Sequence, residues 1–199
     1  RAQTLVEAAK RSIGHTEGLD TARMEMSLLL EDYDRLQNRL KQITELLEKL
    51  VRQVPYAEKL LQIKGIGMKT VSGFIAEVGD ISRFNDAKQI QKLAGQAIVE
   101  NSSGKHNGKS RISKRGRKRL RYLLFEAALS LTATNPEFRE IHRYYTSRET
   151  NPLKKKQSLT VLSNKLIRVF YTILKHGTDY DPNKLTSDIR HPEKVSEAA

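Results

Sequence analysis

The residues with the clearest chemical purpose lie in one stretch, from Asn101 to Arg121. This stretch holds nine Lys or Arg side chains, three glycines and no acidic residue. It also holds two adjacent hydroxyl groups, on Ser102 and Ser103, and the imidazole of His106. Unpaired cations do not pack in an apolar core, but they bind polyanions. The stretch therefore predicts a nucleic-acid contact, with a flexible loop in its first half and the basic start of a helix in its second half.

A serine hydroxyl among cations is the arrangement needed to attack a phosphodiester. The hydroxyl is a weak nucleophile until its proton is accepted, and cations stabilise the charge that develops on the phosphate. The competing interpretation is a turn serine that hydrogen-bonds its own backbone. His106 could serve as the base, although a lone loop histidine is more often only solvated. The cations expected to hold the phosphate are Lys105, Lys109, Arg111, Lys114 and Arg115.

The rest of the basic stretch continues into a predicted helix with apolar residues from Leu120 onward. Arg117, Lys118 and Arg121 are predicted to contact phosphates, because most cations on a basic helix meet the backbone and do not read bases. No aromatic residue was identified among these cations, so base stacking is not indicated.

A second glycine-bearing segment, Gly65-Ile66-Gly67, separates two short apolar-patterned helices at about 56–79. Glycine permits a positive φ in such a turn, and it lets helix amide groups approach a phosphate without an intervening Cβ. Lys69 and Thr70 follow the turn and could add a charge and a hydroxyl. The segment resembles a helix-hairpin-helix, which binds the DNA backbone. Helical hairpins also use Gly-X-Gly for packing alone. Glu77 and Asp80, just beyond, could hold a metal, but capping and solvation are more typical of such a pair.

The elements that position these groups are predicted to be all-α, because no strand alternation is present. The domain boundaries expected are an N-terminal part (1–55), a helical domain (56–180) and a polar, disordered tail (181–199). Asp86 or Asn85 is expected to cap a helix, and Gly177 to end one. The helices are expected at 1–14, 21–53, 56–79 (two short ones), 85–95, 114–132, 136–147 and 159–176.

The predicted helix 21–53 carries a coiled-coil-like stripe. Its apolar residues recur at alternating spacings of four and three, which is the seam of a coiled coil. The stripe either joins a second copy, giving a homo-oligomer through the long helix, or packs on its own domain. Its members are Leu29, Tyr33, Leu36, Leu40, Ile43, Leu47, Leu50 and Val54.

Charge and composition point to the partner. The chain of 199 residues has a net charge of +13, and a basic protein of this kind most often binds DNA or RNA. No apolar run is long enough for a membrane span, so no membrane partner is expected. The absence of cysteine excludes thiolate sites and fits a cytoplasmic, nucleoid-associated protein. The chain begins without Met, so we expect it to be a fragment or processed form.

Taken together, the order of these motifs resembles one family, the insertion-sequence 110/116/902-type transposases, which are bridge-RNA-guided recombinases. The resemblance covers about residues 60–180 and is specific only as a combination. Two departures are the Gln96-Ala97-Ile98 segment, where the family often has Leu-Ala-Pro, and Arg117, where it usually has Asn. The segments that carry it are Lys64-Gly-Ile-Gly-Met-Lys-Thr70, Glu77-Val-Gly-Asp80, Phe84, Leu93-Ala-Gly95, Ser103-Gly104, Arg111-Ile-Ser-Lys-Arg-Gly116 and Leu120-Arg121.

The resemblance implies a function for this chain. It would be the C-terminal, serine-bearing, DNA-binding part of an enzyme that cuts and rejoins double-stranded DNA. The resemblance also implies a guide RNA as a second nucleic-acid partner. The family serine corresponds to Ser103, with the adjacent Ser102 as the alternative. A RuvC-like N-terminal domain, outside this sequence, would hold divalent metal (Mg²⁺), so no cofactor is expected here and the fragment alone would be inactive. The alternatives are a non-catalytic helix-hairpin-helix module that binds DNA or RNA, and a structural role centred on the long helix.

Overall fold

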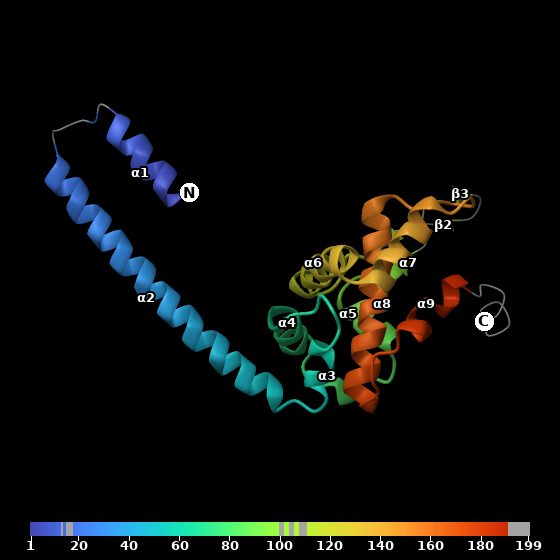
Figure 1. Ribbon diagram of the computed structural model, residues 1–199. Helices are drawn as coiled ribbons and strands as arrows, with labels where there is room; N and C mark the ends of the chain where they lie inside the picture. Colours follow the sequence, from blue (N-terminus) through green and yellow to red (C-terminus); the bar gives the residue numbers. More distant parts are fainter. Residues whose placement is uncertain (13, 15–17, 100–101, 104–105, 108–110, 191–199) are drawn as a thin grey trace. The chain divides into compact units, whose positions relative to one another are not determined.

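The computed structural model describes the whole chain except residues 13, 15–17, 100–101, 104–105, 108–110 and 191–199 (Figure 1). The chain divides into two compact units, Arg1–Leu46 and Leu47–Ala199, and each is described by itself. The described residues are mostly helical, so the all-α prediction is confirmed. None of the described helices combines the length and the apolar character that crossing a bilayer would need.

The first unit consists of α1 (Ala2–Arg11) and most of α2 (Leu19–Arg52), which continues into the second unit. The predicted bounds of α2 were correct to within two residues. The stripe residues from Leu29 to Leu50 lie along α2 with exposed side chains, for example Leu40 at 61% and Ile43 at 57%. Val54, the last predicted member, lies beyond the end of α2 and packs, partly buried, against the core of the second unit. A coiled coil with a second copy stays a prediction.

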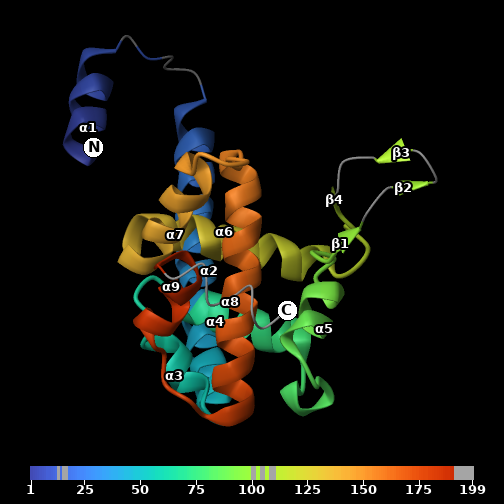
Figure 2. The ribbon, with the colours of Figure 1, turned by 90° about the vertical axis from the view of Figure 1, so that its right-hand side faces the viewer.

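The second unit is built around α8 (Lys155–His176), which packs against most of the other helices (Figure 2). Phe170 of α8 meets Phe74 edge-on, with ring centroids 4.9 Å apart. Ser163 is fully buried and donates its hydroxyl to the Leu124 carbonyl at 3.1 Å. The helices around α8 are α3 (Ala57–Leu61), α4 (Met68–Val78), α5 (Ala87–Leu93), α6 (Lys118–Thr134) and α7 (Pro136–Ser147), with a 3₁₀ turn at Ile81–Arg83.

Several predicted helix ends are confirmed. Asp86 caps α5 by accepting from the Lys88 amide at 2.8 Å, and Asn135 caps α7 by accepting from the Phe138 amide. Gly177 ends α8 with a φ of 67°, the left-handed conformation that glycine adopts easily.

The prediction of a disordered tail from residue 181 was wrong for its first part. Pro182–Arg190 forms a further helix, α9, which packs on α7. Asp181 accepts from the Asn183 amide at 2.9 Å, Leu185 is buried, and Lys165 pairs with Asp188 at 2.6 Å. The remainder of the predicted tail, 191–199, lies outside the described residues.

The segment between α8 and α9 also contacts the short helix α3. Lys59 donates to the Gly177 carbonyl at 2.6 Å and pairs with Asp179 at 2.7 Å. The Tyr56 ring lies so close to Gly177 that a Cβ there would be 2.7 Å from it. The chain after α8 therefore fastens the start of the predicted helix-hairpin-helix.

Short antiparallel strands replace part of the predicted flexible loop. β1 (Ile98–Val99) pairs with β4 (Arg111–Ile112), and β2 (Ser102–Ser103) pairs with β3 (His106–Asn107). We call residues 98–112 the arm; Figure 2 shows β1 and β4 beside α6, with β2 and β3 farther from the helices. Because each strand has only two residues, no alternation was visible in the sequence.

Candidate nucleic-acid interface

The two glycines of the Gly65-Ile66-Gly67 turn serve different purposes. Gly65 has a φ of 94°, and a Cβ on it would overlap the hydroxyl of Thr134 and come within 3.2 Å of Leu131. Gly67 has a φ of −112°, and a Cβ on it would meet no atom within 4 Å. Gly65 is therefore required by packing and backbone conformation, whereas Gly67 leaves open space at the start of α4.

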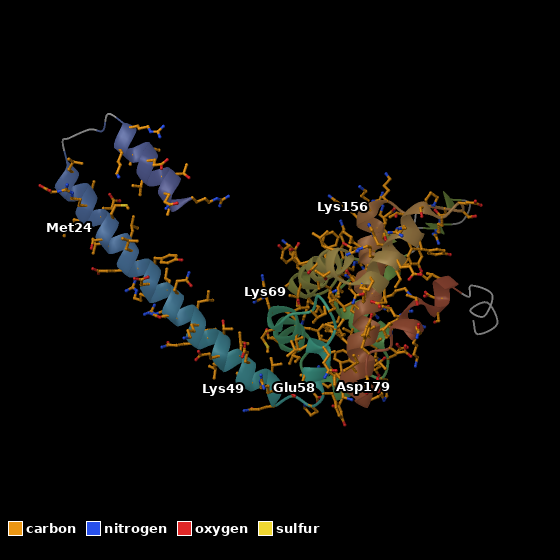
Figure 3. All side chains as sticks on the ribbon, in the orientation of Figure 1. Met24, Lys49, Glu58, Lys69, Lys156 and Asp179 are labelled. Carbon is orange, nitrogen blue, oxygen red and sulfur yellow. The ribbon has the colours of Figure 1, made fainter. Side chains whose placement is uncertain are left out.

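The start of α4 offers amide groups to that open space. Gly67 is the N-cap, no side chain caps the helix, and its first turn contains no acid. The amides of Thr70 and Val71 bond to the Gly67 carbonyl, but those of Met68 and Lys69 have no acceptor in the described part of the chain. Such amides and the helix dipole favour an anion. Lys69 is exposed on the same turn and is labelled in Figure 3.

The start of α6 is a second anion-favouring helix end. Arg117 is the N-cap without a side-chain cap, and the first turn holds cations and no acid. Cations at the positive end of a helix cost about 0.3–1 kcal/mol each. The cations at this end therefore destabilise the free protein, and a bound anion would offset that destabilisation. The exposed cations here are Lys114, Arg115, Lys118 and Arg119, and Arg111 is exposed in β4.

One carboxylate partly compensates this cluster. Glu77 of α4, only 17% exposed, lies 3.7 Å from Arg117 and 3.6 Å from Arg119. Arg117 also donates to the Glu77 carbonyl at 2.5 Å. The guanidinium of Arg117 thus joins α6 to α4, so its predicted DNA contact has an intramolecular competitor.

The metal interpretation of Glu77 and Asp80 gains no support from these contacts. Glu77 is engaged by two arginines, and Asp80 accepts from the Ser82 amide and hydroxyl. The Ser82 hydrogen bonds hold the pKa of Asp80 below its usual value. Across the described residues, no group of three or more His, Asp or Glu side chains is placed to hold a metal ion.

Arg121 faces inward and contacts backbone carbonyls. Its Nη1 donates to the Ala94 carbonyl at 3.0 Å and to the Lys114 carbonyl at 3.2 Å. Sequence reasoning assigned this side chain to DNA because it lies in a basic run, where such partners are not visible.

The Gly65-Ile66-Gly67 turn and the basic start of α6 do not form a single cluster. Helices α4 and α6 pack with opposite directions: Gly65 approaches Thr134, Gly73 approaches Leu123, and Glu77 meets Arg117. The two helix starts are therefore at opposite ends of the pair, about 15 Å apart for ten residues of helix.

The arm contains the predicted nucleophile. Ser103 lies in β2 and pairs in register with His106, and Ser102 pairs with Asn107. Lys105 and Lys109 lie outside the described residues.

One exposed aromatic side chain was not predicted from the sequence as part of the interface. Tyr122 is 65% exposed and lies one helical turn after Lys118 on α6. The i, i+4 spacing was the available signal, because it places both side chains on one face.

The fold and these helix ends define an all-α, basic domain with two sites of anion-binding type. Comparison with known proteins narrows the class. Residues 57–143 match the family "Transposase IS116/IS110/IS902 family". This part of the chain is similar to that transposase family, and the resemblance seen in the sequence is confirmed.

Relatives agree with the family match. An IS900 uncharacterized 42 kDa protein of Mycobacterium paratuberculosis is 25% identical over 94% of this chain and 46% of its own length. The pilin gene-inverting protein of Moraxella bovis is 30% identical over 63% of this chain and 38% of its own. A probable family 20 transposase of Pseudomonas aeruginosa is 26% identical, over 77% of this chain and 46% of its own. The chain spans less than half the length of these relatives.

Proposed function

We propose that this chain is the DNA-binding, serine-bearing part of a transposase that cuts and rejoins DNA. The observation that carries the proposal is the start of α6, where exposed cations surround an uncapped helix N-terminus with no acid in its first turn. Within a transposase-family domain, the phosphate backbone is the anion that fits this end.

Duplex DNA would bind along the α4/α6 pair. The Met68 and Lys69 amides, with Thr70 and the Lys69 charge, would hold one phosphate. The cations at the start of α6, with Arg111, would hold others about 15 Å away. In this proposal the segment 56–79 acts as a helix-hairpin-helix, and its contacts position the duplex without reading its sequence.

The proposed chemistry is phosphoryl transfer to Ser103. Its oxygen forms a bond to phosphorus while the bond from phosphorus to the leaving deoxyribose oxygen breaks. The serine proton passes to a base, and the leaving oxygen gains a proton. The covalent link preserves a phosphodiester for rejoining. A divalent metal and a guide RNA belong to the proposal only through the family resemblance, and the described residues offer no three-carboxylate site for the metal.

The exposed stripe of α2 fits a second copy of the chain as partner. Coiled-coil pairing buries side chains that recur every three and four residues, and Leu40 and Ile43 are exposed at such positions. Leu40→Glu should reduce a homo-oligomer to monomers in sedimentation analysis and leave the melting temperature of the second unit unchanged. An unchanged sedimentation coefficient would exclude this seam as the interface.

The nucleophile is tested in the full-length protein. Ser103→Ala should abolish both excision and the covalent DNA adduct, whereas Ser102→Ala should retain them. Loss in Ser102→Ala alone would move the assignment by one residue. If adduct-free DNA binding is all that the wild type shows, the chain is the alternative, a non-catalytic nucleic-acid-binding module.

A further inference from the structure

We infer that Arg121 is a positioning residue that anchors the arm to α6, and that it does not bind DNA. The inference deepens the proposed function, because the arm carries Ser103. In this inference Arg121 holds the base of the arm and so helps to position Ser103. This role replaces the phosphate contact that was predicted because Arg121 lies in a basic run.

The two carbonyls that accept from Arg121 flank the arm in the sequence, one before it and one after it. Ala94 precedes β1 and Lys114 follows β4, and a single Nη1 donates to both carbonyls, at 3.0 and 3.2 Å. A guanidinium donor between two backbone segments joins them as a cross-link does. The side chain is half-buried, so this donor is partly withdrawn from solvent and from a ligand.

Backbone hydrogen bonds close the same junction. The Ser113 amide donates to Ala97 at 2.8 Å, the Lys114 amide to Gly95 at 2.9 Å, and the Arg117 amide to Leu93 at 2.7 Å. These bonds run from the segment after β4 to the segment before β1. They continue the β1–β4 pairing down to the first turn of α6.

Two glycines allow this close approach. Gly95 has a φ of 69°, and a Cβ on it would lie 2.9 Å from both the Arg121 Nη1 and the Arg115 carbonyl. A Cβ on Gly116 would overlap the Leu93 carbonyl. Since any larger residue would force the two segments apart, the junction depends on glycine at both positions.

Lys114 shows that the junction is held against a conformational preference. Its φ is 55°, a left-handed value that is strained for a non-glycine residue. Its amide donates to Gly95 and its carbonyl accepts from Arg121, so both sides of the strained residue are fixed.

Ser103 lies far along the arm from the junction that Arg121 holds. Ser103 is five residues beyond Ile98 in the sequence, a span of at most about 17 Å for an extended chain at about 3.3 Å per residue. A rotation of about 10° at the base would displace Ser103 by up to roughly 3 Å at that span. Misplacement by about 1 Å can cost roughly 100-fold in rate. Loss of the anchor should therefore reduce reaction far more than DNA affinity.

The experiment compares Arg121→Met with Lys118→Met in the full-length protein. Arg121→Met should accelerate hydrogen exchange of the Lys114 and Arg117 amides, leave the salt dependence of DNA binding unchanged, and lower the yield of Ser103–DNA adduct at least tenfold. Arg121→Lys, which keeps a donor, should restore part of the adduct. Lys118→Met should lower the salt slope by about one unit and leave exchange at those amides unchanged.

Two results would overturn the inference: a lower salt slope with unchanged amide exchange in Arg121→Met, or faster exchange with full adduct yield. A wild-type protein without any adduct would refute the proposed nucleophile instead. The exchange comparison would then still decide the anchoring role, since it needs no reaction.

Discussion

Replacing Gly67 by serine should raise the free energy of unfolding and lower the affinity for DNA. A serine at the N-cap accepts from amides of the first turn, which in the proposed complex face a phosphate. The space around Gly67 is empty to 4 Å and its φ of −112° suits any residue, so the new side chain brings no strain. The change adds no charge.

The magnitudes follow from the same amides. An N-cap serine exceeds glycine by a few tenths of a kcal/mol, so the free energy of unfolding should rise slightly. A hydrogen bond to a charged group contributes about 1.5–3 kcal/mol, which corresponds to a loss of roughly 10- to 100-fold in DNA affinity.

Two measurements test this pair of effects: urea unfolding, and fluorescence anisotropy with a labelled duplex at fixed salt. Gly65→Ala is the contrasting variant, because strain and overlap with Thr134 should destabilise the domain by about 2–5 kcal/mol. Undiminished affinity in a folded Gly67→Ser protein would show that these amides do not bind phosphate.

Three further predictions concern single residues. Lys114→Gly should relieve the left-handed strain, raise stability by up to about 1 kcal/mol in urea unfolding, and lower the salt slope of DNA binding by about one. Burial, and then the charge of Lys155, lowers the pKa of His142, so the folded state favours the neutral imidazole. Stability should fall as pH drops below about 6.5, and a His142→Gln variant should show a flatter profile in melting experiments. Burial raises the pKa of Tyr180 to about 12, so stability should be lost as pH rises from about 10 to 12, and Tyr180→Phe should remove that loss.

The helices were predictable because their signals are local. Asn135-Pro136 and Asp86 specify helix starts through their own side chains, and Gly177 ends α8 because it readily adopts a positive φ. The start of α9 carried similar signals, Asp181 followed by Pro182. We did not predict α9 because the surrounding sequence is polar. Its buried apolar contact, at Leu185, depends on tertiary packing that the sequence does not show.

The arrangement of the candidate site could not be predicted from the sequence, and its assignment to DNA stays a prediction. Glycines and cations that could contact phosphates were visible in the sequence, but the opposite directions of α4 and α6 separate the two helix starts. Arg121 looked like its neighbours in the sequence, and only its carbonyl partners, seven and 27 residues away, distinguish it. The pairing of Ser103 with His106 was hidden because two-residue strands leave no pattern.

The contacts of Lys59 with Gly177 and Asp179 have a practical consequence for shortened versions of the protein. α3 is only five residues long, too short to persist alone, and its outer side is tied to chain more than a hundred residues downstream. A truncation at His176 would free that side while sparing every residue predicted to touch DNA. Weak binding by such a product would report a loosened scaffold, and domain-mapping experiments should retain the chain through Arg190.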